Sequence, residues 1–151
     1  MMLSSWGEAL SHVLSLTLAY ALALPVGWDR EKDARSAGIR TFPLVAIASC
    51  GFVLVGIAIL GRTDPAQARI LEGLITGVGF IGGGAILKHR GRASGTATAA
   101  SLWATGALGA AVGYGLYDIA VVLSLTTFLT LRCSRPLKRA THEEHGTLDR
   151  S

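Results

Sequence analysis

Charged residues are scarce in this chain, and long stretches contain none. Only 16% of the 151 residues are Asp, Glu, Lys or Arg, whereas half are hydrophobic. The longest uncharged stretches are 9–28, 41–61, 73–87 and 93–117. A soluble domain needs a largely polar surface, so this composition predicts an integral membrane protein whose apolar segments lie in a lipid bilayer.

The uncharged stretches also lack polar faces. A soluble helical bundle is the alternative, but its helices would carry a polar face at a period of 3.6 residues, and these stretches are apolar all round. Residues 1–6 include no Lys or Arg. A cleaved signal peptide begins with a basic region, so we expect the first apolar stretch to be a retained helix and the mature chain to start near Met1.

Clusters typical of catalysis or metal binding are missing as well. The two cysteines, Cys50 and Cys133, fit no metal-ligand spacing and no disulfide framework. No nucleophile with a nearby base and no paired carboxylates occur in the apolar stretches, so an enzyme is not expected. His12 is either a proton relay or, as we favour, a hydrogen-bonded packing residue. Lys and Arg lie in short loops, which argues against nucleic-acid binding.

What is present predicts an all-α, polytopic transmembrane bundle. A membrane span needs about 20 residues, and the expected helices are 8–28, 41–60, 70–87, 96–114 and 118–133. The last two could instead form a re-entrant hairpin. We place the transmembrane domain at residues 1–135. Residues 136–151 are polar without an apolar period, which predicts a short disordered tail.

The distribution of Lys and Arg gives an orientation, because basic loops are retained in the cytoplasm. Four basic residues lie in 29–40, two in 61–69 and three in 88–95, and five lie from Arg132 to the end. The first segment and the turn 115–118 have none. Basic-rich and basic-poor connections therefore alternate, and five spans place the N-terminus outside and the C-terminus in the cytoplasm.

The third expected helix carries two stripes of glycine. Gly73, Gly77 and Gly84 lie within about 40° of one another on a helical wheel, and Gly79 and Gly83 form a second stripe. Small residues spaced in this way let helices approach closely in membranes. Gly77-x-Gly79-x-x-Gly82 formally matches a dinucleotide-binding fingerprint, but no strand precedes it and no acidic residue follows about 20 residues on. Helix packing is the better interpretation.

The fourth expected helix combines small and hydroxyl residues. Its small residues share an arc of about 100°; they are Gly95, Ala99, Gly106, Gly109, Ala110 and Gly113. Thr98, Ser101 and Thr105 lie beside that arc. These hydroxyls predict interhelical hydrogen bonds, or alternatively a water-filled or substrate-lining path. Trp103 lies off the small face, so we expect it to contact lipid or pack.

A few charged residues stand at the edges of the spans. Asp29 and Arg40 could pair across the first loop, or bind an ion or a partner at the bilayer surface. Glu72 could pair with Arg69, three residues earlier on the helix. Otherwise Glu72 could attract a cation together with another acidic residue on the predicted outer side, namely Asp118, Asp64 or Glu8. Because Mg²⁺ needs only one or two carboxylates, the metal-ligand candidates are Glu72, Asp118 and Asp29.

Four motifs carry a family resemblance: Asp29-Arg30-Glu31, then Ala37-Gly38-Ile-Arg40-Thr41, then Gly77-Val-Gly79-Phe-Ile-Gly82-Gly-Gly84-Ala-Ile86, then Gly95-Thr-Ala-Thr98-Ala-Ala-Ser101-Leu-Trp103. In this order they resemble the MgtC/SapB family, over roughly residues 10–131. The chain departs from the usual pattern at Asp29, where the family has Glu, and at Ala97, where it has Thr. Many members continue into a folded cytoplasmic domain, which is not found after Pro136.

The resemblance implies a bacterial inner-membrane protein linked to Mg²⁺ homeostasis, growth in low Mg²⁺ and survival inside host phagocytes. Two hypotheses follow. The first is a non-enzymatic factor that contacts other membrane proteins, or itself, through small-residue helix faces. The second is a Mg²⁺ transporter or channel in which Glu72, Thr98 and Ser101 line a path between the third and fourth helices. No resident cofactor is expected apart from a possible Mg²⁺ ion.

Overall fold

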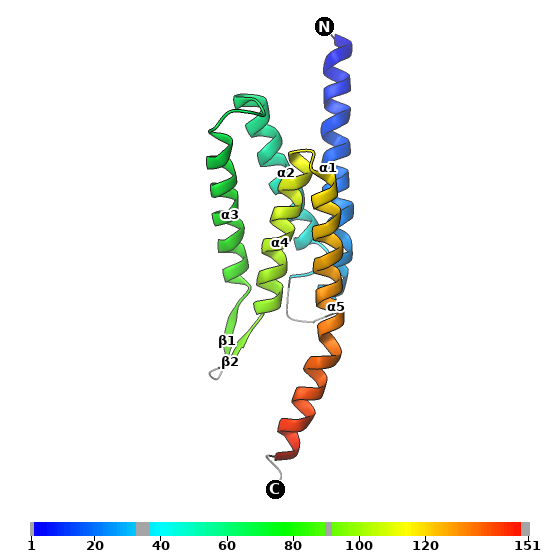
Figure 1. Ribbon diagram of the computed structural model, residues 1–151, viewed down its shortest axis with the longest axis vertical. Helices are drawn as coiled ribbons and strands as arrows, with labels where there is room; N and C mark the ends of the chain where they lie inside the picture. The colour runs from blue at the N-terminus through cyan, green and yellow to red at the C-terminus, as the bar shows by residue number, and fades with distance from the viewer. Residues whose placement is uncertain (1, 33–36, 90–91, 149–151) are drawn as a thin grey trace.

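The computed structural model of the chain is a bundle of five helices, which confirms the all-α fold class (Figure 1). It describes residues 2–32, 37–89 and 92–148. Three of the basic residues counted for orientation, Arg35, Arg90 and Arg150, lie outside these ranges.

The helices agree closely with the uncharged stretches. They are α1 (Met2–Glu31), α2 (Thr41–Leu60), α3 (Gln67–Gly84), α4 (Thr96–Gly113) and α5 (Tyr117–Leu148). A short antiparallel hairpin of β1 (Leu87–His89) and β2 (Arg92–Ser94) connects α3 to α4, where we expected only a charged loop. Gly95 follows this hairpin at a φ of 87°, and a Cβ there would lie 2.1 Å from the carbonyl oxygen of Ala85.

The end of α5 differs from the sequence prediction. We expected a disordered tail from residue 136, but α5 continues as a helix to Leu148. The sequence from Leu137 onward contains Leu, Lys, Arg, Ala and Glu, all of which have high helix propensity. Polarity alone therefore did not indicate disorder.

α4 lies at the centre of the bundle and packs against all four other helices (Figure 1). Ala23, Cys50 and Leu108 belong to a core cluster formed mainly by α1, α2 and α4. Phe42, Val78 and Leu102 belong to a second cluster, which extends to α3. The N-terminal part of α1 projects beyond the ends of the other helices, and Trp6 on this projection is 72% exposed.

Two helices are long and apolar enough to cross a membrane by length and composition: residues Trp6–Glu31 and Thr41–Leu60. They suit a membrane protein, and most of their side chains are not buried within the chain. Among the described residues no other helix meets this criterion, and α3 and α4 contain much Gly, Ser and Thr, which have low hydropathy. Five spans, a re-entrant hairpin and the orientation of the termini stay predictions.

Candidate functional site

The small-residue face of α4 packs closely against α2 and α3. A Cβ on Gly109 would lie 2.3 Å from the carbonyl oxygen of Ala46 on α2, and one on Gly113 would lie 2.7 Å from Val53. Gly106 is equally close to Val78 of α3. The expected role of these glycines in close helix packing is therefore confirmed, and the contact lies inside the chain.

Three hydroxyl residues of α4, Thr98, Ser101 and Thr105, are buried, and the hydrogen bonds that Ser101 and Thr105 donate to described residues stay within α4. The Oγ of Ser101 donates to the carbonyl oxygen of Thr98 at 3.0 Å, and the Oγ1 of Thr105 donates to that of Ser101 at 2.8 Å. Thr98 is buried beside them. Our expectation of interhelical hydrogen bonds is wrong for Ser101 and Thr105, because a helix carbonyl one turn back satisfies each hydroxyl locally.

Most glycines of α3, unlike those of α4, do not lie against another helix. α3 packs on α4 through Leu74, Val78 and Gly82, and a Cβ on Gly82 would lie 3.1 Å from the carbonyl oxygen of Ala99. The other five have open space where a Cβ would be: Gly73, Gly77, Gly79, Gly83 and Gly84. Phe80, between the two stripes, is 84% exposed. Both predicted stripes thus lie on the surface and contact no other helix of the described chain.

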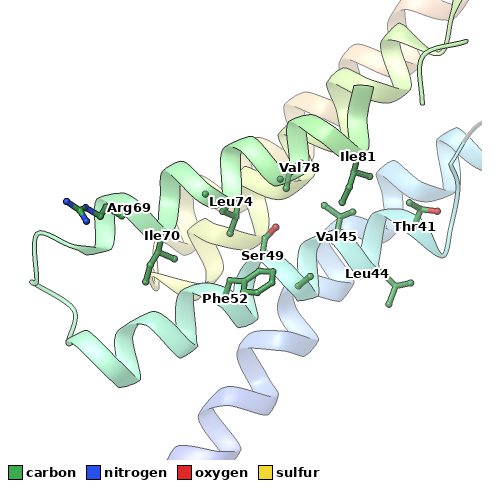
Figure 2. A pocket seen from close by; sticks show the side chains of 13 residues that line it. Thr41, Leu44, Val45, Ser49, Phe52, Arg69, Ile70, Leu74, Val78 and Ile81 are labelled. Atoms are coloured by element: carbon green, nitrogen blue, oxygen red, sulfur yellow. The ribbon is translucent and has the colours of Figure 1, made fainter. Parts of the chain in front are cut away.

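One of these stripes lines a groove between α2 and α3, called here the α2–α3 groove (Figure 2). Its volume is about 700 Å³. Its walls are mainly apolar side chains, with Gly73 and Gly77 on the α3 side. Arg69 and Thr41 line it as well, from the beginning of α3 and the beginning of α2. The groove therefore runs along most of the length of both helices.

The first two family motifs form a compact connection between α1 and α2. The Arg30 Nη2 and Asp29 Oδ2 atoms are 3.0 Å apart, in an ion pair whose side chains are 7% and 0% exposed. The carboxylate of Glu31 accepts a hydrogen bond from the backbone amide of Ile39 at 2.8 Å. Gly38 is buried against Glu31, where a Cβ would collide with the carboxylate. These residues have a structural role in setting the start of α2.

Two expected ion pairs are not formed. Arg40 is exposed at the beginning of α2, and Asp29 pairs with Arg30 instead. Arg69 and Glu72 are both exposed, and no ion pair joins them in the described chain. Arg69 lines one end of the α2–α3 groove, and its side chain extends outward from the groove (Figure 2), whereas Glu72 does not line the groove.

The three candidate metal ligands are not brought together. Glu72 and Asp118 are exposed near the beginnings of α3 and α5, whereas Asp29 is buried near the end of α1, at the opposite end of the bundle. Within the described residues, no group of three or more His, Cys, Asp or Glu side chains is arranged to hold a metal ion. These three carboxylates therefore do not converge on one place, and Mg²⁺ binding stays a prediction.

The cavity between α3 and α4 also differs from the predicted ion path. Its volume is about 290 Å³, its lining is apolar, and Trp103 forms part of it as an exposed side chain. None of the predicted path residues Glu72, Thr98 and Ser101 lines it. Thr98 and Ser101 are instead buried in the bundle.

A polar cavity of about 510 Å³ lies where α1 passes the end of α2 and the α4–α5 turn. Glu8, His12, Arg62 and Tyr117 line it. We expected His12 to be a packing residue, but it is exposed and lines this cavity. The sequence signal was the spacing of polar residues 8, 11, 12 and 15, which places them on one face of α1.

Comparisons with known proteins agree on one family. The family model described as MgtC family matches residues 16–140. SrpB of Synechococcus elongatus is 38% identical over 145 residues, covering 88% of this chain and 80% of SrpB. YhiD of Escherichia coli, whose name proposes a magnesium transporter, is 33% identical over 125 residues, covering 79% of this chain and 58% of YhiD. MgtC of Brucella abortus is 33% identical over 131 residues, covering 86% of this chain and 54% of that protein. This chain thus spans little more than half of the latter two. No solved structure matches.

Proposed function

The chain belongs to the MgtC family, and on that premise we propose that it is a non-enzymatic, multi-pass protein of the bacterial inner membrane. In this proposal it supports growth in low Mg²⁺ by contacting other membrane proteins. The relatives named MgtC and YhiD support the link to Mg²⁺. In the described part of the chain, by contrast, no three His, Cys, Asp or Glu side chains are grouped to hold the ion itself.

The observation that carries the proposal is the open glycine surface of α3. Packing inside the chain explains Gly82 on α3 and the glycines of α4, but not Gly73, Gly77 or Gly79, which face open space. Glycine costs helix stability by about 1 kcal/mol relative to alanine, so an exposed glycine stripe needs another reason. Close approach of a further transmembrane helix supplies that reason.

Complementation in low-Mg²⁺ medium tests the proposal. Gly77→Leu should abolish growth of a strain that depends on this protein, because the leucine occupies the α2–α3 groove while its Cβ collides with nothing in the chain. Gly51→Leu is the matched control, since Gly51 on α2 also has open space but does not line the groove. Both variants must reach wild-type abundance in the membrane. Full growth of the Gly77→Leu strain at that abundance would refute the proposal.

A second candidate function, passage of an ion or small solute, is favoured by the polar cavity beside α1. Carboxylate, imidazole and guanidinium groups line it, and ionisable residues at such positions in membrane helices often mark a permeation path. Flux of Mg²⁺ into liposomes containing the purified protein is the test. Flux that disappears in the Glu8→Gln variant and persists in Glu72→Gln would establish this function and locate the path beside α1.

A further inference from the structure

We propose that copies of this chain associate by placing the exposed face of α5 from one copy in the α2–α3 groove of the next. This inference rests on the proposed function, which takes the helices as membrane spans and the groove as a contact surface. It adds the identity of the occupant, a helix of the same chain, and the register in which that helix lies.

The groove has an unmet polar group as well as space for a helix. Ser49 is 2% exposed and lines the groove, and its hydroxyl bonds to no residue in the part of the chain that the structure describes. Figure 2 shows the oxygen of Ser49 directed away from α2, toward the side on which α3 and α4 lie. A lipid acyl chain offers no partner for a buried hydroxyl, whereas a helix carrying a hydroxyl residue does.

The exposed face of α5 has the spacing of a helix-packing seam. Val122, Leu125 and Leu129 are each more than half exposed, and they follow Asp118 at intervals of four, three and four residues. This alternation keeps one face toward a partner in left-handed helix packing, which is the common geometry of membrane bundles. α5 packs mainly on α1 and α4, and the exposure of these three side chains shows that the described helices leave the seam largely uncovered.

Charge and direction agree with this pairing. α3 and α5 run in the same direction (Figure 1). Arg69 is the third residue of α3 and lines the groove, and Asp118 is the second residue of α5 and is exposed. With α5 of a second copy in the groove, the guanidinium and the carboxylate lie at the same depth and form an ion pair.

The same register provides a partner for Ser49. Counting eight residues along each helix from the ion pair brings Thr126 of the second copy level with Gly77. The Oγ1 of Thr126 already donates to the carbonyl oxygen of Val122 at 2.7 Å, so it is free to accept a further hydrogen bond from Ser49.

The two surfaces lie on opposite sides of the molecule, which determines the symmetry. Figure 1 shows α3 and α5 on either side of α4, and both pack on α4. A groove on one side that receives a helix from the other side is a head-to-tail contact. Copies with the same orientation in a membrane then close into a ring of three or more. A two-fold dimer is excluded because it cannot place α5 of each copy in the groove of the other at the same time.

Disulfide cross-linking in native membranes tests the contact. Arg69→Cys and Asp118→Cys are placed on two differently tagged full-length copies in a Cys133→Ser background, where the remaining Cys50 is buried. We expect a disulfide between the two tags on mild oxidation, and none when both copies carry the same substitution. Cross-links only between identical substitutions, or no cross-link at all, would overturn the proposal.

Charge exchange provides a test that a simple folding defect does not mimic. Arg69→Glu alone and Asp118→Arg alone should each lower the amount of the oligomer, seen by mass measurement in detergent, by about threefold or more. The double variant should restore it. Gly77→Leu should abolish the oligomer, while Gly51→Leu should leave it unchanged. A double variant no better than either single variant would count against the pairing.

The outcomes separate this inference from the function on which it rests. If the chain is monomeric and Gly77→Leu still abolishes growth, the groove binds another protein; the proposed function then stands and the inference falls. If the ring forms and Gly77→Leu removes it without affecting growth, the inference stands and the proposed function falls.

Discussion

Gly109 of α4 lies directly against the backbone of Ala46 on α2, so close that a single methyl group would be 2.3 Å from the Ala46 carbonyl oxygen. This contact explains why glycines with the same spacing differ in how strongly their substitution should affect stability. Gly109 meets backbone, which cannot rotate away, whereas the glycines on the open face of α3 meet nothing.

The first prediction compares Gly109→Leu with Gly79→Leu. Gly109→Leu should destabilise the folded protein by about 3 kcal/mol or more, because the added side chain forces α2 and α4 apart. Gly79→Leu should leave the midpoint of thermal unfolding in detergent unchanged or slightly raised, since leucine favours helix more than glycine does. A comparable loss in both variants would mean that the two glycines are in similar surroundings.

The second prediction concerns the carboxylate of Glu31. Glu31→Ala removes the acceptor for the Ile39 amide and should lower the free energy of unfolding by about 1 kcal/mol. Lys32→Ala, the neighbouring change at an exposed side chain, is the control and should have little effect. Denaturant titration of the detergent-solubilised protein measures both. An equal loss in the two variants would show that this hydrogen bond adds nothing.

The third prediction concerns the buried pair of Asp29 and Arg30. Asp29→Asn leaves a buried guanidinium without its carboxylate and should cost about 3 to 5 kcal/mol. The double variant Asp29→Leu, Arg30→Met should be more stable than Asp29→Asn, because it buries no charge. Thermal unfolding of the three proteins decides this, and a double variant that is the least stable would contradict the argument.

The fourth prediction is the orientation in the membrane. Fusions of a reporter that is active only outside the cytoplasm should be inactive after Arg40 and Arg139 and active after Asp64. The reason is the alternation of basic-rich and basic-poor connections. An active fusion after Arg139 would overturn the five-span topology.

Much of the fold was predictable because charge is so unevenly distributed. The uncharged stretch 41–61 predicts α2 to its first and last residue, Thr41 and Leu60. The role of Gly106, Gly109 and Gly113 in packing was predictable too, since glycine on one face of a membrane helix has few other uses. These inferences depend only on local composition and helical period.

The candidate site was less predictable, since it depends on which neighbour each helix face meets. On a helical wheel, Gly77 and Gly109 each lie on a small-residue face of their helix. Only the assembled bundle shows that α3 packs mainly on α4 and leaves a groove toward α2. The ion pair expected between Arg69 and Glu72 failed for a related reason. Spacing within a helix gives the distance between two positions, but the surrounding helices determine where each side chain lies.

The central position of α4 has a consequence for how the protein is made. The ribosome delivers the helices in order, and α4 is the fourth of five. α1 and α2 pack on each other and can pair as soon as they leave the insertion machinery, but α3 has its main partner in α4. Until that helix arrives, α3 can pack only on α2, its weaker partner, and the face that α4 will cover stays open. Biogenesis is therefore the stage at which a damaged α4 glycine exposes the chain to quality-control proteases.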